Sequence, residues 1–543
     1  MSFRMLLSLA LFSATLPAQV TFDRLLHADR EPLNWLTYSG GYQSQRYSML
    51  GQITPQNVKN LEPKWVFQVE SLQKFEATPL VVDGIMYVTQ PPNDVIAIDA
   101  RTGRAFWIYQ YKPAPDAKPC CGFVNRGLAI LGDTLFMGTV DAHLVAIDAK
   151  NGKPLWNNDV APHADGYALT VAPLVIKDKV VVGMAGGEFG IRGFIAAYDA
   201  KTGKEAWRFH TIPGPGEPGH DTWPADDSWK HGGASIWVTG SYDQDLNLTY
   251  WGIGNPGPDW NAAQRRGANL YSDSVVALDA DTGKLKWHFQ FTPNDPYDYD
   301  SVQIPVLVDA SWDGRPRKLM LWANRNGFFY ALDRASGQFL SGHPFVKVNW
   351  ANGLDDSGKP MFTPQPEDVP VYPGVQGGTN WYSPSYSPRT NLFYVSAWED
   401  YGTIFQPEEV EYKAGQHFTG GRPRSPISRA PNPGLRAGPI NTWTEATGHG
   451  AVYALDIRTG QRKWKYDMTD VTDSGILTTA SDLLFTGGRE GYFHALDART
   501  GALLWKTSVG GQVAAAPITY QVDGKQYVAI AAGHALFVYG LRE

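Results

Sequence analysis

The chain has 543 residues, a net charge of -7, 43% hydrophobic residues and 19% charged residues. This balance is typical of a large globular protein, and it excludes a disordered chain and a basic surface that binds nucleic acid. The 19 Trp, 26 Tyr and 56 Gly residues indicate many short strands joined by tight turns.

The N-terminus predicts a segment that is removed from the mature protein. Arg4 precedes an apolar run over residues 5–16, and Pro-Ala-Gln follows at 17–19. This arrangement is typical of a secretory signal peptide over residues 1–19, and a buried N-terminal helix is the alternative. Because no later apolar run is long enough to span a bilayer, we expect a soluble protein exported to the periplasm.

A short phrase recurs seven times along the chain. Each copy begins with an apolar stretch that leads into Ala-x-Asp. Two residues follow, then one of Thr, Ser or Asn, and then Gly. Six copies carry a Trp four residues after the Gly. Asp and Gly favour the turn between two strands, so each copy predicts a hairpin. The closest copies lie 41 to 54 residues apart, about the size of one four-stranded propeller blade. The aspartates are Asp99, Asp148, Asp199, Asp279, Asp333, Asp456 and Asp497, and the tryptophans are Trp107, Trp156, Trp207, Trp287, Trp464 and Trp505.

Two longer gaps between copies predict blades that carry insertions. The first gap contains a Gly-, Pro- and His-rich segment at about 213–230, and the second contains another at about 401–442. Long loops of this kind are often functional.

The two ends of the chain together supply one further blade. Predicted strands at 514–520, 526–532 and 535–539 have no repeat phrase, and residues 61–67 form a Trp-bearing strand without preceding strands. Joining them closes a ring and removes the exposed sheet edges. The prediction is an all-β, eight-bladed β-propeller of four-stranded antiparallel blades with Trp packed between them, formed by one domain over residues 20–543.

The only two cysteines, Cys120 and Cys121, are adjacent. They cannot link distant segments, and a bond between them would close a small ring. Two reduced, buried cysteines are the alternative. Export favours oxidation, and with it the disulfide.

Four polar residues interrupt the repeat pattern in segments that lead toward a central channel. They are Glu188, Asn255, Asp298 and Asp300. Their oxygen atoms are the hard ligands that calcium-like cations prefer. Ordinary turns and solvated loops are the alternative for each of them.

The whole chain after the N-terminal segment resembles the pyrroloquinoline-quinone (PQQ) dependent alcohol dehydrogenases, the methanol and ethanol dehydrogenase group of eight-bladed quinoproteins. The family motif Cys-Cys-x-x-x-Asn-Arg-Gly matches residues 120–127, and Gly-Gly-x-x-x-Trp matches residues 232–237. The resemblance implies that the Cys120–Cys121 disulfide lies on one face of PQQ and Trp237 on the other.

The resemblance also assigns the remaining site residues. It implies that Glu188, Asn255 and Asp298 bind the metal, that Asp298 is catalytic, and that Arg325 orients Asp298. The implied PQQ contacts are Glu76, Cys120, Cys121, Arg126, Thr170, Gly186, Gly187, Trp237, Arg325, Asn380 and Trp381.

Asp300 indicates which cation is used. Family members that use lanthanides carry an Asp two residues after the catalytic one, where calcium-dependent members usually have a small uncharged residue. Glu188, Asp298 and Asp300 supply three negative charges, which suit a trivalent lanthanide ion (La, Ce, Pr or Nd) better than Ca²⁺. The alternative is a solvated Asp300 in a calcium enzyme.

The resemblance implies that a small primary alcohol is oxidised to an aldehyde. The cation acts as a Lewis acid on the quinone, Asp298 accepts the alcohol proton, and hydride passes to the cofactor. Tyr297 stands where many relatives have Trp, so the identity of the alcohol is not predicted.

The sequence contains no Cys-x-x-Cys-His motif for a fused haem. A separate soluble cytochrome c is therefore the implied electron acceptor, and many relatives form homodimers. A different class, the non-enzymatic propeller scaffold of outer-membrane assembly, shares the Trp-bearing repeats and lacks the quinone and metal motifs.

Overall fold

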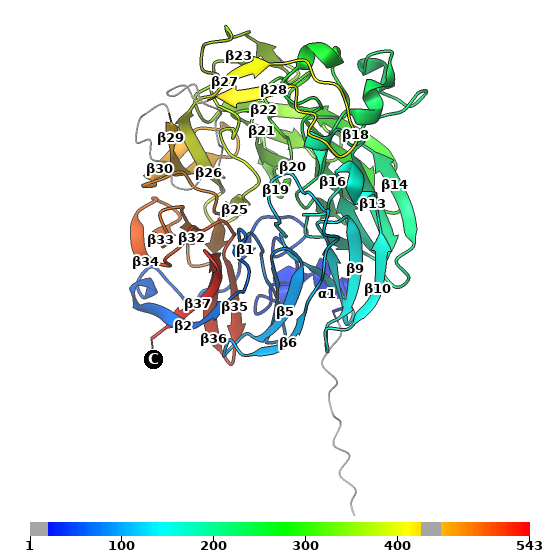
Figure 1. Ribbon diagram of the computed structural model, residues 1–543. Helices are drawn as coiled ribbons and strands as arrows, with labels where there is room; N and C mark the ends of the chain where they lie inside the picture. The colour runs from blue at the N-terminus through cyan, green and yellow to red at the C-terminus, as the bar shows by residue number, and fades with distance from the viewer. Residues whose placement is uncertain (1–19, 425–446, 543) are drawn as a thin grey trace, which may run out of the picture.

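The computed structural model describes residues 20–424 and 447–542, and most of its regular structure is β-strand. The strands form eight blades of a propeller, each a four-stranded antiparallel sheet, and one of these sheets gains a short fifth strand (Figure 1). The predicted fold class is confirmed. The predicted signal peptide at 1–19 and residues 425–442 of the second predicted insertion lie outside the described residues.

The first four blades follow one another in the chain, and each is built in sequence order. Their strands are β3 (Leu80–Val82), β4 (Ile85–Gln90), β5 (Asp94–Asp99) and β6 (Ala105–Tyr109); β7 (Ala129–Leu131), β8 (Thr134–Gly138), β9 (His143–Asp148) and β10 (Pro154–Asp159); β11 (Leu174–Ile176), β12 (Lys179–Gly183), β13 (Phe194–Asp199) and β14 (Glu205–His210); and β15 (Ser241–Asp243), β16 (Leu248–Gly252), β17 (Ser274–Asp279) and β18 (Leu285–Gln290).

The next three blades follow the same plan, with additions. The short strand β1 pairs in parallel with β31, and two-stranded sheets lie between β22 and β25 and between β26 and β29. The strands are β19 (Val306–Trp312), β20 (Arg315–Ala323), β21 (Phe328–Asp333) and β22 (Phe339–Pro344); β25 (Ser385–Ser387), β26 (Leu392–Tyr401), β29 (Thr447–Asp456) and β30 (Arg462–Asp467); β1 (Tyr47–Ser48) with β31 (Leu477–Thr479), β32 (Leu483–Gly487), β33 (Tyr492–Asp497) and β34 (Leu503–Ser508); β23 (Ala351–Leu354) with β24 (Pro360–Phe362); and β27 (Ile404–Pro407) with β28 (Gly421–Arg424).

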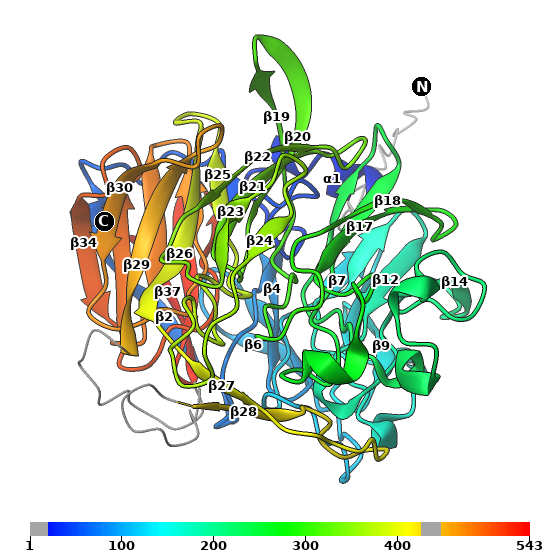
Figure 2. The ribbon, with the colours of Figure 1, turned by 90° about the horizontal axis from the view of Figure 1, so that it is seen from above.

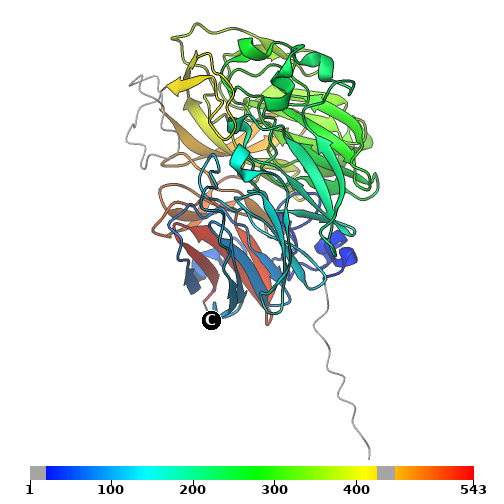
Figure 3. The same ribbon diagram turned by 45° about the vertical axis from the view of Figure 1, so that its right-hand side comes forward.

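The eighth blade joins the two ends of the chain, as predicted. Strand β2 (Leu61–Gln68) pairs antiparallel with β37 (Ala535–Leu541), which continues into β36 (Lys525–Ala532) and β35 (Ile518–Val522). Figure 3 shows these blue and red strands side by side. The predicted start of β35 at residue 514 was wrong, because Pro517 has no amide hydrogen for the ladder and pairing begins after it.

Helices are few and short in the described part of the chain, and none of them is long and apolar enough to cross a membrane. They are α1 (Phe22–Leu26) and the 3-10 helices Ala28–Arg30, Val58–Asn60, His163–Asp165, Gly187–Phe189, His220–Thr222, Asp227–His231 and Ala262–Arg265.

Tryptophan side chains join neighbouring blades at the repeat turns. The Trp107 ring lies against Gly152 in the turn of the next blade, where φ is +72° and a Cβ would lie 2.6 Å from the ring. Its indole Nε1 donates to the Ala149 carbonyl at 3.2 Å. The same hydrogen bond forms from Trp65 to Ala100, Trp156 to Ala200, Trp207 to Ala280 and Trp464 to Ala498.

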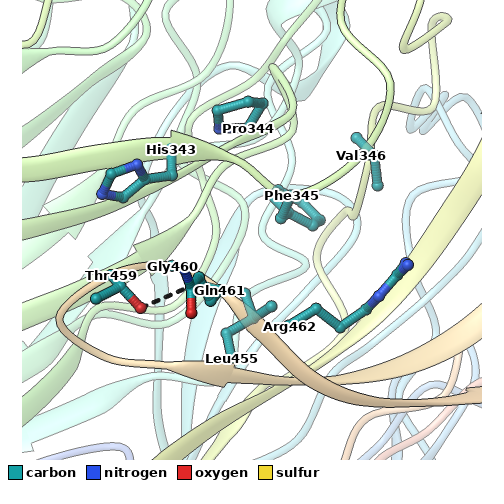
Figure 4. Close-up of a pocket in the computed structure, with 9 residues that line it drawn as sticks. All are labelled: His343, Pro344, Phe345, Val346, Leu455, Thr459, Gly460, Gln461 and Arg462. Carbon is teal, nitrogen blue, oxygen red and sulfur yellow. Dashed lines mark hydrogen bonds between the residues drawn. The ribbon is translucent and has the colours of Figure 1, made fainter.

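The repeat copy without a tryptophan produces a local hollow. At this blade interface His343 instead lies against the turn glycine Gly460. A pocket of about 400 Å³ lies between β22 and the β29–β30 turn (Figure 4). The apolar contact that an indole ring provides elsewhere is therefore reduced here.

We predict that Gly152→Ala lowers the free energy of unfolding by about 2 to 4 kcal/mol. The added Cβ meets both a positive φ and the Trp107 ring. Gly84→Ala is the matched control, because its φ is +86° and nothing lies within 4 Å of the added Cβ. The control costs about 1 to 2 kcal/mol through the backbone alone. Urea unfolding of both variants measures the difference, and equal losses would contradict tryptophan docking as a source of stability.

Candidate functional site

Strand topology places the predicted site residues on one face of the ring. In a four-stranded antiparallel blade, the loop between the second and third strands and the connection to the next blade leave from the same end. Glu188 lies between β12 and β13, and Asp298 lies between β18 and β19. The repeat turns lie at the opposite end. The other predicted site residues also lie in connections of these two kinds: Glu76, Cys120, Cys121, Arg126, Thr170, Gly186, Gly187, Trp237, Asn255, Asp300, Arg325, Asn380 and Trp381.

Arg325 holds two carboxylates of the predicted cation site. Its Nη2 lies 3.0 Å from Asp298 Oδ2, and its Nη1 lies 2.6 Å from Asp300 Oδ2. Nε donates to the Val375 carbonyl at 3.0 Å, which fixes the plane of the guanidinium. The Asp298 side chain is 18% exposed and that of Asp300 is 9% exposed, so Asp298 is the more accessible of the two acids.

Burial and neighbouring charge act on these groups in opposite directions. Burial raises the pKa of Asp298 well above its usual range; Arg325 lowers this pKa, and Asp300 raises it. Burial also lowers the pKa of Arg325, but the two carboxylates outweigh this effect and leave the pKa raised. The three side chains therefore form one coupled electrostatic unit.

Asn255 is joined to the same unit through its backbone. Its amide nitrogen donates to Asp300 Oδ1 at 2.9 Å, and the residue is 4% exposed. The side-chain oxygen of Asn255 faces Gly187: a Cβ atom added to that glycine would lie 3.9 Å from Asn255 Oδ1. A side chain on Gly187 would narrow the space between the two loops.

Glu188 and the cysteine pair lie together at the edge of this unit. Cys120 and Cys121 form a disulfide, which confirms that prediction. Glu188 Oε1 lies 2.7 Å from Cys120 Sγ. Within the described part of the chain, the carboxylate oxygens of Glu188, Asp298 and Asp300 do not all lie within 4.8 Å of one another. It nevertheless raises the pKa of Asp298 by charge repulsion, so its carboxylate belongs to the same electrostatic neighbourhood.

Arg126 organises the predicted cofactor side of the site. Nη2 pairs with Glu76 Oε2 at 2.9 Å, and Nη1 donates to Thr170 Oγ1 at 3.0 Å and to the Trp237 carbonyl at 3.1 Å. The guanidinium lies 4.9 Å from the centre of the Trp237 ring and 4.7 Å from that of Trp381. Arg126 Nε is buried and has no hydrogen-bond partner in the described ranges. An acidic, planar ligand fits this combination of flat rings and a spare donor.

The remaining predicted residues shape the backbone around this group. Gly186 has a φ of +118°, and a Cβ there would clash with the Gly166 carbonyl. Asn380 Nδ2 donates to the Gln376 carbonyl at 3.1 Å, and its Oδ1 accepts from the Trp381 amide at 2.9 Å. Asn380 therefore holds the loop that presents Trp381.

A second charged group on this face was missed by the sequence analysis. Lys74 Nζ lies 3.5 Å from Glu76 Oε1 and 3.3 Å from Asp473 Oδ2. Asp473 is fully buried and pairs with Arg489 at 3.0 and 3.2 Å. These residues have no motif, and their only signal was their position in the same kind of connection as the predicted ones.

The described part of the second predicted insertion crosses the face as a strap, defined here as residues 403–424. The Phe418 amide donates to the Glu188 carbonyl at 2.7 Å. Gln264 Nε2 donates to the Val410 carbonyl at 3.0 Å, and Gln264 Oε1 accepts from the Val410 amide at 3.1 Å. Figure 2 shows β27 and β28 lying along this side of the molecule. The strap covers the loop that carries Glu188.

We predict that Arg325→Met lowers the free energy of unfolding by about 3 to 5 kcal/mol, because it leaves two buried carboxylates without their cation. The combined variant Arg325→Met, Asp298→Asn, Asp300→Asn removes those charges and is expected to regain most of the loss. Urea unfolding at neutral pH measures both variants. A combined variant as unstable as Arg325→Met would show that lost packing, and not charge, is the cause.

Comparison with known proteins agrees with this geometry. The sequence model of the PQQ-dependent glucose/ethanol/alcohol dehydrogenase β-propeller domain matches residues 35–349 and 349–528. The chain is 38% identical to the quinoprotein alcohol dehydrogenase PedH of Pseudomonas putida, over 97% of this chain and 91% of that protein. It is 39% identical to the 1-butanol dehydrogenase (cytochrome c) of Thauera butanivorans, over 92% of this chain and 74% of that protein.

A solved structure shows the same similarity in three dimensions. The fold superposes on a europium-containing methanol dehydrogenase with a TM-score of 0.88 and 33% identity, covering 96% of this chain and all of that one. Together with the family match, this shows that the chain belongs to the PQQ-dependent alcohol dehydrogenase family.

Proposed function

We propose that this protein oxidises primary alcohols to aldehydes with PQQ and a lanthanide ion. The observation that carries the proposal is the pair of carboxylates, Asp298 and Asp300, held by one guanidinium at 3.0 and 2.6 Å. Asn255 adds an amide oxygen beside them, and Glu188 adds a third carboxylate. The similar europium-containing methanol dehydrogenase supports the choice of a trivalent cation.

The residues of this chain fit both groups. Arg126 has an unpartnered Nε, and its guanidinium lies over the rings of Trp237 and Trp381, so it would bind an acidic quinone. The Cys120–Cys121 disulfide and Trp237 would lie on the two faces of the quinone. Glu188, Asn255, Asp298 and Asp300 would hold the cation. When bound, PQQ supplies the two-electron acceptor, and the cation supplies Lewis acidity.

Asp298 is proposed as the base that takes the alcohol proton. Arg325 binds its Oδ2, so the proton is expected at Oδ1. Asp298 accepts the proton in its ionised form, which Arg325 favours by lowering the pKa of Asp298. Arg325 keeps the carboxylate oriented, and the preceding residue, Tyr297, is buried with its ring 5.0 Å from that of Phe405.

Reconstitution tests the proposed reaction. Apo-protein with PQQ and La³⁺ is expected to oxidise primary alcohols in a dye-linked assay, with a lower rate when Ca²⁺ replaces La³⁺. Asp298→Asn should reduce kcat by about 100-fold or more, the usual contribution of a general base. Asp300→Ala should lose the lanthanum-dependent rate.

Three results would contradict parts of this proposal. Equal rates with Ca²⁺, or an Asp300→Ala variant that keeps its lanthanum-dependent rate, would favour a calcium enzyme. Bound PQQ without oxidation under either condition would favour a non-enzymatic scaffold.

We further propose that residues 1–19 are a signal peptide, that residues 20–543 act as one domain in the periplasm, and that a soluble cytochrome c accepts the electrons. The name of the similar 1-butanol dehydrogenase (cytochrome c) supports the acceptor. The mature N-terminus is expected near residue 20 in protein recovered from a periplasmic extract. Sequencing that N-terminus checks this, and an intact Met1 in the extract would contradict the signal peptide.

A further inference from the structure

Lys74 brings an additional positive charge to the predicted cofactor side of the site. It lies in the connection between β2 and β3, two residues before Glu76. Its Nζ forms ion pairs with Glu76 Oε1 at 3.5 Å and with Asp473 Oδ2 at 3.3 Å. Asp473 lies in the connection between β30 and β31, so Lys74 joins loops from two parts of the ring on the face that carries the predicted site residues.

Each of these two carboxylates already has a guanidinium partner. Arg489 binds both oxygens of Asp473, through Nε at 3.0 Å and Nη2 at 3.2 Å, and Gln512 Nε2 donates to the same carboxylate at 2.5 Å. Arg126 Nη2 pairs with Glu76 Oε2 at 2.9 Å. Three cations therefore contact two carboxylates, and the charge of the lysine is the surplus one. A surplus cation in a partly buried position suits an anion that comes from outside the chain.

The surplus charge lies where a ligand can reach it. The Lys74 side chain is 29% exposed, whereas those of Glu76 and Asp473 are 5% and 0% exposed. The side chains of Arg126 and Arg489 are 5% and 8% exposed. Lys74 is thus the accessible member of an otherwise buried group of charges, and its two buried partners fix the position of its ammonium group.

The Trp381 ring lies beside both Lys74 and Arg126. The Lys74 ammonium nitrogen is 5.7 Å from the centre of this ring, and the Arg126 guanidinium is 4.7 Å from it. Glu76 contacts the same two cations, one through each of its oxygens. Because Arg126, Glu76 and Trp381 are proposed contacts of the quinone, Lys74 lies among the residues that would surround it.

We propose that Lys74 is a further PQQ-binding residue, whose ammonium group supplies positive charge for a carboxylate of the cofactor. PQQ carries several carboxylates, whereas the guanidinium groups of Arg126 and Arg325 are already paired with carboxylates of the protein. A cation without a carboxylate of its own can therefore contribute more to the binding of an anionic ligand. The inference rests on the proposed function and adds one residue to the cofactor site that the sequence motifs do not include.

The test measures PQQ binding to the full chain without turnover. Apo-protein with La³⁺ is titrated with PQQ, and quenching of tryptophan fluorescence gives the affinity. Lys74→Met removes the charge and keeps an unbranched apolar stem, so it is expected to weaken PQQ binding by about 10- to 100-fold. Lys74→Arg should restore most of the affinity. Added salt should weaken PQQ binding more steeply in the wild type than in Lys74→Met, because the variant has one ionic contact fewer.

Lys318→Met is the matched control for removing a lysine that joins two carboxylates. The Lys318 side chain is 30% exposed and pairs with Asp243 at 3.4 Å and Asp245 at 2.7 Å. Asp243 is also buried and has a guanidinium partner, Arg334, at 2.7 Å. The Lys318 carbonyl accepts from the Arg334 amide in a repeat turn, at the end of the blade opposite the site. PQQ affinity should therefore stay as in the wild type.

The outcomes separate this inference from the function on which it rests. A wild-type protein that does not bind PQQ would overturn the proposed cofactor site and this inference together. A wild-type protein that binds PQQ, with the same affinity and salt dependence in Lys74→Met, would overturn the role of Lys74 alone. Equal weakening in Lys74→Met and Lys318→Met would also overturn it, because the loss would not depend on position. Should Lys74→Met fail to fold, Lys74→Gln takes its place, and unchanged PQQ affinity in that variant would overturn the inference.

Discussion

The contact between a tryptophan and the turn glycine of the next blade is the constraint on which the ring depends. It occurs in the same form at several interfaces, with the indole over the glycine and its N–H bonded to a turn carbonyl, as between Trp107 and the turn of Gly152. A repeated contact of fixed geometry sets the same angle between successive blades, so the chain returns to its start and β37 meets β2. The hollow at Gly460, where no tryptophan is present, shows that one interface can deviate without opening the ring.

This contact also separates stability from chemistry. The docking turns lie at one end of every blade, and the connections that carry the polar residues lie at the other. The site face is therefore free to hold long loops and unusual backbone, such as the positive φ of 62° at Asp298. Insertions on that face, including the strap over Glu188, leave the docking turns untouched.

Excess negative charge is the main property of the site. Asp298 and Asp300 share Arg325, and the charge of Glu188 lies close enough to raise the pKa of Asp298. Burial alone would drive such acids toward their neutral forms. A highly charged cation would reverse this tendency, which is why the arrangement of acids bears directly on the choice of metal. In the second group Arg126 pairs with Glu76 and lies close to the rings of Trp237 and Trp381, and its spare donor suits an anionic, planar ligand.

Much of this protein followed from local sequence patterns. The repeat phrase predicted seven hairpins, because Asp, Gly and Trp act within one turn and the next blade, and the unmatched strands at the two ends of the chain predicted the eighth blade. The adjacent cysteines and Asp298-x-Asp300 were recognisable because their partners are close in the chain. The burial of Asp259 and the positions of Lys74 and the strap were decided only by tertiary structure. Asp259 lies in a Gly-Pro-Asp-Trp segment that resembles an ordinary solvated turn, and its burial depends on loops from several blades meeting on one face. Such long-range approach leaves no periodic signal in the sequence.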